Sequence, residues 1–151
     1  MSKDLEKKFP EYFKNFKLPE LAREQELNVY RACATGKVDQ ESFLNTYEEN
    51  GNKVIDGYDI SDATAYSLSA YTKFKDIKRF MHMQSKYKVP YTIAVGITNP
   101  IYGVCLETKE WKKSLGEKCK SSHVDWWLYE GARPWEGFKE VVYDDDGNPI
   151  E

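Results

Sequence analysis

Residues 65–103, AYSLSAYTKFKDIKRFMHMQSKYKVPYTIAVGITNPIYG, change their apolar pattern twice. Over residues 65–71 apolar side chains alternate with Ser67 and Ser69, the two-residue period of a half-buried strand. Residues 72–87 then follow a helical period. The run 91–97 is rich in β-branched and aromatic residues, which favour a buried strand. The order strand, amphipathic helix, strand is therefore the centre of the predicted fold.

The rest of the chain is predicted to place helices before this centre and strands after it. Patterns of apolar, capping and turn residues predict helices over 3–16, 20–34 and 39–50, and strands over 103–108, 123–129 and 138–143. Strand 103–108 is expected to pair antiparallel with the strand before it, and 109–122 to be weakly structured. The predicted class is α+β, with N-terminal helices packed on a mainly antiparallel sheet that carries one inserted amphipathic helix. We expect one domain over 1–151, with a helical part (1–51) and a sheet-forming part (65–143).

Composition indicates a soluble globular protein. Hydrophobic residues make up 40% of the 151 residues and charged residues 31%, and no apolar run approaches the roughly 20 residues of a membrane span. The N-terminus is charged and lacks the apolar core of a secretory signal. The three cysteines form no C-x-x-C pair, and with two histidines they predict neither a disulfide framework nor a metal site. We expect a cytoplasmic protein without a membrane partner.

The net charge of −3 hides a segregation along the chain. Residues 1–64 carry −4, residues 65–120 carry +7 and residues 121–151 carry −6. A basic centre between acidic ends fits either an anionic ligand at the centre or charge pairing within the fold. Nucleic acid is the less favoured anion, because the acidic total repels a polyanion.

The predicted 72–87 helix concentrates its basic residues on one side. Its opposite face carries Phe74, Ile77, Phe80 and Met81, as expected for a helix that packs on a sheet. The candidate anion-binding residues on the basic side are Lys75, Lys78, Arg79 and Lys86. A solvated face is the alternative to a binding surface.

Cys105, His123 and Asp125 are a candidate set for nucleophilic catalysis if their strands are neighbours. Because Cys105 stands within an apolar run, the alternative is a small buried hydrophobic residue. The adjacent Trp126 and Trp127 should face opposite sides of their strand.

The order of elements resembles that of small ADP-ribosyltransferases. The resemblance rests on Tyr30-Arg31, on Tyr66-Ser67-Leu68-Ser69 before a helix, and on His123-Val124-Asp125 in a late strand. In that family an Arg or His near the first strand, a Ser/Thr-rich strand and a late acidic residue hold NAD and polarise its glycosidic bond. The resemblance implies Arg31, Ser67, Ser69 and Asp125 as catalytic residues and NAD as the dinucleotide bound.

The other interpretation is a small accessory or regulatory protein that binds a protein or an anionic partner and needs no cofactor. The sequence favours this interpretation, because it contains no strong catalytic motif, and such proteins include those of phages and mobile elements. If it holds, Asp125 should be an exposed strand carboxylate. If the enzyme interpretation holds, Arg31, Ser67, Ser69 and Asp125 should converge on one pocket.

Overall fold

The computed structural model describes residues 8–33, 35–53, 63–84, 92–143 and 149–150. Six strands form one sheet: β1 (Asn28–Cys33), β2 (Leu68–Tyr71), β3 (Thr92–Ile97), β4 (Gly103–Glu107), β5 (His123–Leu128) and β6 (Lys139–Glu140). The short strands β7 (Val142–Tyr143) and β8 (Pro149–Ile150) pair with each other. The α-helices are α1 (Thr46–Glu49), α2 (Phe74–Gln84) and α3 (Thr108–Ser114), accompanied by the 3₁₀ turns η1 (Glu11–Asn15), η2 (Gln40–Phe43), η3 (Ala63–Tyr66) and η5 (Pro134–Gly137). The fold is α+β, as the sequence predicts.

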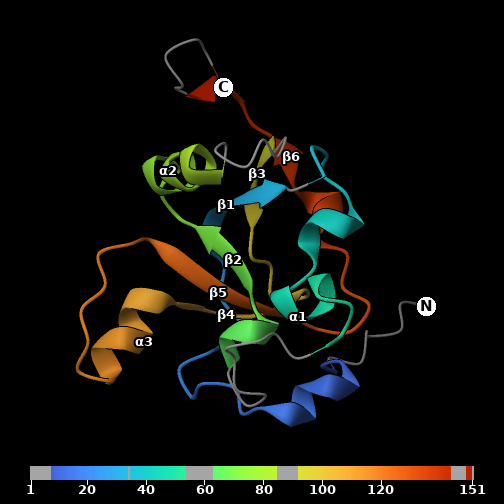
Figure 1. The fold of residues 1–151 in the computed structure, drawn as a ribbon, viewed down its shortest axis with the longest axis vertical. Helices are drawn as coiled ribbons and strands as arrows, with labels where there is room; N and C mark the ends of the chain where they lie inside the picture. Colours follow the sequence, from blue (N-terminus) through green and yellow to red (C-terminus); the bar gives the residue numbers. More distant parts are fainter. Residues whose placement is uncertain (1–7, 34, 54–62, 85–91, 144–148, 151) are drawn as a thin grey trace.

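The main sheet has the order β4-β5-β2-β1-β3-β6, and every neighbouring pair is antiparallel. β1 pairs with β3 along six residues but meets β2 at a single pair, Tyr30 and Tyr71. The sheet therefore splits between its two central strands. In Figure 1, α2 lies across the end of the sheet formed by β1 and β3, and α3 lies beside β4 and β5.

The predicted N-terminal helical part is largely wrong. Residues 28–33, inside the helix expected over 20–34, form the central strand β1. The spacing of Val29, Ala32 and Cys33 suits one helix face, and a short apolar run does not distinguish helix from strand. Pairing with β3 along the whole strand decides the outcome. The other two predicted helices shrink to η1, η2 and α1, although Asp39 caps η2 through Ser42, as expected for this residue type.

The central stretch follows the prediction more closely. The helix and the strand over 91–97 are confirmed as α2 and β3, with residues 85–91 outside the described part. The strand expected over 65–71 begins only at Leu68, because residues 63–66 form η3. Tyr66 explains the difference, since its ring is stacked with Phe16 at a centroid distance of 4.4 Å and also contacts aromatic rings of η1 and α1.

Two expectations about the second half are corrected. β4 does not pair with β3; it pairs with β5 along five residue pairs. Thr98 directs β3 away from a hairpin, because its backbone and hydroxyl bond to Leu27 just before β1. Residues 109–114, in the segment expected to be weakly structured, are helical and belong to α3, because Trp111 packs against Trp127 at a ring distance of 6.2 Å.

The last two predicted strands have different outcomes. Strand 123–129 is confirmed as β5. The strand predicted over 138–143 is divided, with β6 in the main sheet and β7 paired with β8.

Apolar side chains fill both faces of the sheet. One core cluster contains Val29, Leu68, Val124 and Trp126, and another contains Leu106 and Trp127 near η1 and α3. A third lies under α2, where Ile77 is fully buried with Phe74, Phe80 and Met81 beside it. Trp126 and Trp127 therefore face opposite sides, as predicted, and both are buried. Within the described residues, no helix is long and apolar enough to span a membrane.

Candidate functional site

Three neighbouring strands carry the four residues that the family resemblance selects. β2 lies between β1 and β5 in the sheet. Arg31 is in β1, Ser69 is in β2 with Ser67 just before it, and Asp125 is in β5, where it is the register partner of Ser69. Residues separated by nearly a hundred positions in sequence thus meet at the centre of the sheet.

Arg31 occupies the split between β1 and β2. Its guanidinium donates to three main-chain carbonyls: Nη1 to Ser69 O at 2.7 Å, Nε to Ser42 O at 3.1 Å and Nη2 to Leu44 O at 3.3 Å. The guanidinium fork suits this geometry, since it offers several donors in one plane. These contacts fix the guanidinium in place, and its central carbon lies 6.0 Å from the centroid of the Phe43 ring.

A cavity of about 230 Å³ lies beside this guanidinium, and we refer to it as the Arg31 cavity. Its polar lining comes from Arg31, Ser67, Ser69, Thr46 and Glu49. Leu44, Ile77 and Phe80 contribute its apolar surface. Three of the four predicted catalytic residues therefore converge on one cavity.

Asp125 does not line this cavity. It is 2% exposed, and each of its carboxylate oxygens accepts a hydroxyl: Ser67 Oγ donates to Oδ1 at 2.8 Å, and Thr108 Oγ1 donates to Oδ2 at 2.7 Å. Ser67 thus connects the buried carboxylate to the cavity. The expectation of an exposed strand carboxylate is wrong, because β5 lies inside the sheet and α3 begins beside it.

His123 continues this network. Its Nδ1 lies 2.6 Å from Thr108 Oγ1 and 3.9 Å from Asp125 Oδ2. Its ring meets Tyr71 edge to face at 5.3 Å. Burial lowers the pKa of His123, Asp125 opposes that shift, and the Arg31 charge adds to it. The imidazole is therefore biased towards its neutral form.

Thr108 and Glu49 are site residues that the sequence did not suggest. Thr108 stood at the end of a predicted strand, before a segment expected to be weakly structured. Glu49 stood in a predicted helix with no visible link to Arg31. In the structure, burial raises the pKa of Glu49 and Arg31 lowers it, so the two charges share the cavity region.

The candidate set of Cys105, His123 and Asp125 is not assembled. Cys105 is the register partner of Trp126 and belongs to the core on the opposite face of the sheet from Asp125. Its Sγ contacts Thr98 Oγ1 at 3.5 Å, and burial raises the pKa of its thiol. Cys105 is 1% exposed, which confirms the interpretation of a small buried hydrophobic residue.

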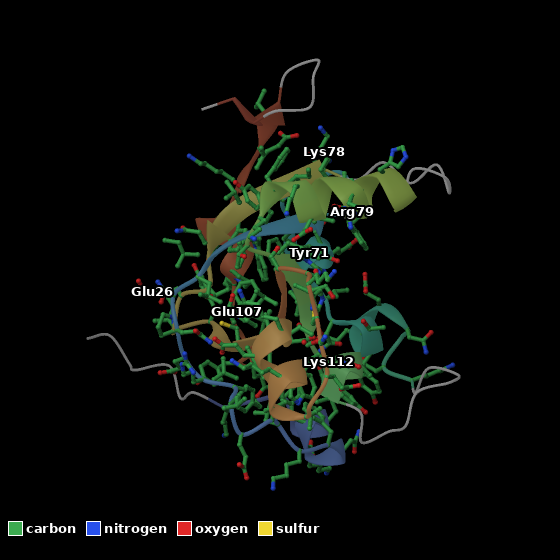
Figure 2. All side chains as sticks on the ribbon, turned by 90° about the vertical axis from the view of Figure 1, so that its left-hand side faces the viewer. Glu26, Tyr71, Lys78, Arg79, Glu107 and Lys112 are labelled. Carbon is green, nitrogen blue, oxygen red and sulfur yellow. The ribbon has the colours of Figure 1, made fainter. Side chains whose placement is uncertain are left out.

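The basic residues of α2 lie apart from the Arg31 cavity. Lys75, Lys78 and Arg79 are exposed, and Lys86 lies outside the described residues. Figure 2 shows Lys78 and Arg79 on α2, above the strand that carries Tyr71. The same helix turns Ile77 and Phe80 into the cavity lining.

A larger cavity of about 800 Å³ contains none of the four predicted catalytic residues. Its lining includes Tyr12, Phe43, Leu128, Arg133 and Trp135. It is lined by Leu44, as the Arg31 cavity is, so this side chain borders both spaces. The two cavities are neighbours across Leu44.

Comparisons of the chain with protein-family models, curated protein sequences and solved structures find no match. Among the described residues, no group of three or more His, Cys, Asp or Glu side chains is placed to hold a metal ion.

Proposed function

We propose that this chain is an ADP-ribosyltransferase-like enzyme that binds NAD in the Arg31 cavity. The observation that carries the proposal is the convergence of Arg31, Ser67 and Ser69 on one cavity, with Ser67 bonded to Asp125. The strand position of Arg31 adds support, because the family resemblance implies an Arg near the first strand and residues 28–33 form β1.

The lining of the cavity suits the nicotinamide ribose end of NAD. Leu44, Ile77 and Phe80 offer apolar contact to a planar ring, while hydroxyl and guanidinium groups suit a sugar with two free hydroxyls. Pockets for drug-sized ligands measure about 300–1,000 Å³. At about 230 Å³, the Arg31 cavity holds one end of the dinucleotide, and the remainder extends beyond it.

Ser67 contributes acceptor character to the cavity. Its Oγ lies 2.8 Å from Asp125 Oδ1 and 3.3 Å from the Thr64 carbonyl oxygen, so the shorter bond takes the single hydroxyl hydrogen and the oxygen is left to accept a hydrogen bond from a ligand. A ribose hydroxyl is a suitable donor. Arg31, whose position is set by three carbonyls, attracts the anionic diphosphate.

Asp125 acts through its charge. As the bond between the ribose anomeric carbon and the nicotinamide nitrogen breaks, its electron pair leaves with the nitrogen and positive charge develops at the carbon. A negative carboxylate next to Ser67 stabilises that charge more than it stabilises bound NAD, and this difference lowers the barrier. Water or an acceptor nucleophile then bonds to the carbon and loses a proton to solvent.

Binding and turnover are tested separately. NAD should raise the melting temperature in a concentration-dependent way, since NAD at 100 times its Kd stabilises a folded protein by about 2.7 kcal/mol. Nicotinamide release is then followed with and without candidate protein acceptors. An unchanged melting temperature at millimolar NAD, together with no nicotinamide release, rejects the proposal.

A second candidate function is an accessory protein that binds an anionic partner through α2. The observation that favours it is the exposure of Lys75, Lys78 and Arg79 on one helix whose other face is buried. These residues carry positive charge to the surface without taking part in the core. This function needs no cofactor and leaves the Arg31 cavity unused.

A further inference from the structure

We infer that Thr108 is a positioning residue for Asp125, and that His123 sets the direction in which the Thr108 hydroxyl donates. The inference concerns the hydrogen-bond network itself, and only its kinetic consequence rests on the proposed NAD chemistry.

Topology places Thr108 beside the two β5 residues that it contacts. Leu106 of β4 is the register partner of Asp125, and Glu107 that of Val124. The next residue, Thr108, leaves the sheet and begins α3. Its Oγ1 is then 2.7 Å from Asp125 Oδ2 and 2.6 Å from His123 Nδ1.

The hydrogen positions in this network follow from a simple count. The Thr108 hydroxyl has one hydrogen, and an ionised carboxylate can only accept. Thr108 therefore donates to Asp125 Oδ2, and its oxygen must accept from the histidine. His123 consequently carries a hydrogen on Nδ1, and its Nε2 is unprotonated when the ring is neutral.

This arrangement orients the carboxylate from both sides. Ser67 donates to Oδ1 and Thr108 donates to Oδ2, so both oxygens have a defined direction. His123 prevents Thr108 from turning its hydrogen away, because Nδ1–H needs the Thr108 oxygen as acceptor. Nδ1 lies 3.9 Å from Asp125 Oδ2, too far for a direct hydrogen bond, so the hydroxyl is the only bridge between them in the described residues.

A capping role does not explain the Thr108 hydroxyl. Threonines at helix starts commonly bond to backbone N–H groups of the first turn. In α3 the N-cap is Glu107, which makes no side-chain capping bond, and the Thr108 hydroxyl is directed at β5. Thr108 thus connects α3 to the buried carboxylate.

The test is the tautomer of His123, read from the ¹⁵N shifts of the imidazole nitrogens in the full chain. The chain contains two histidines, so the signals of His82 are recognised by their loss in the variant His82→Gln. Wild type and Thr108→Ser should show the neutral ring with hydrogen on Nδ1. Thr108→Val, which removes the bridging oxygen at nearly constant volume, should shift the ring towards hydrogen on Nε2.

Two NMR results overturn the inference: a wild-type His123 with hydrogen on Nε2, or a Thr108→Val protein that keeps hydrogen on Nδ1. The wild-type measurement decides even if Thr108→Val fails to fold.

The kinetic consequence is tested separately. If the wild type releases nicotinamide from NAD, Thr108→Val should lower kcat about tenfold at unchanged KM, which is the change in rate equivalent to one hydrogen bond. Thr108→Ser should restore kcat. An unchanged kcat overturns the positioning role. An inactive wild type with the expected tautomers contradicts the NAD proposal and leaves the network established.

Discussion

The Ser67 hydroxyl, just before β2, donates a 2.8 Å hydrogen bond to Asp125 Oδ1 of β5, across 58 residues of sequence. Ser67 lines the Arg31 cavity and Asp125 is buried behind it. A buried carboxylate is thereby coupled to a cavity that also contains a fixed guanidinium. This arrangement suits a function that needs both a carboxylate and a guanidinium close to one small cavity.

Asp125→Asn should preserve the fold and abolish nicotinamide release. The amide keeps the shape of the carboxylate, but its nitrogen cannot accept a hydroxyl, so either Ser67 or Thr108 loses its acceptor. We expect a destabilisation of about 1–3 kcal/mol in urea unfolding, the usual cost of an unsatisfied buried polar group. The control is Glu110→Gln, an exposed carboxylate on α3. Undiminished release by Asp125→Asn would exclude a role for this charge in turnover.

Arg31→Lys should weaken NAD binding and the fold together. Lysine keeps the positive charge, but its ammonium group lacks the planar, spread N–H donors with which the guanidinium reaches the carbonyls of Ser42, Leu44 and Ser69. Loss of one hydrogen bond from a charged donor costs about 1.5–3 kcal/mol, which sets the scale of the expected destabilisation. Unfolding midpoints and NAD titrations measure the two effects. Arg23→Lys, at an exposed side chain, should change neither.

Binding of inorganic polyphosphate should weaken, and the salt dependence of that binding should flatten, when glutamine replaces Lys75, Lys78, Arg79 and Lys86. The reason is that counterions released from the polyanion dominate contacts with exposed cations. Binding is measured by calorimetry at several salt concentrations. The matched control replaces four exposed lysines elsewhere: Lys109, Lys113, Lys118 and Lys120. Equal slopes for the two variants would remove α2 as a specific anion site.

His123 should make the free energy of unfolding decrease as pH falls from about 7.5 to 5. Burial lowers its pKa in the folded state, with Asp125 opposing and Arg31 reinforcing the shift, while the unfolded side chain titrates near 6.5. The unfolded chain therefore binds the proton first. Stability is fully present above the unfolded pKa and is lost as pH falls towards the folded value.

The pH effect is measured by urea unfolding of the wild type and His123→Gln. The variant should show a smaller decrease between pH 7.5 and 5, and His82→Gln, at an exposed position, should retain the wild-type decrease. Tyr71 stays neutral across this range, because burial raises its pKa, with the charges of Asp76 and Asp125 adding to the shift. Parallel curves for wild type and His123→Gln would show that His123 does not titrate differently on folding.

Local pattern alone determined several elements of this protein. Alternation and β-branched content predicted β3, β4 and β5, the apolar stripe of Phe74, Ile77, Phe80 and Met81 predicted α2, and Asp39 marked the start of η2. Each of these signals lies in residues close together in sequence, because it depends either on the spacing of apolar side chains or on a residue that caps a helix. The α+β class followed from their order.

Only the tertiary structure decided that Val29, Ala32 and Cys33 belong to a strand, since β3 supplies the partners of that strand from 59 to 69 residues further along the chain. It also decided the split beside Tyr30, the carbonyls that hold Arg31, and the meeting of Thr108 with Asp125 and His123. The physical reason is that strand pairing and buried hydrogen bonds depend on partners distant in sequence, and no local period records which strands become neighbours.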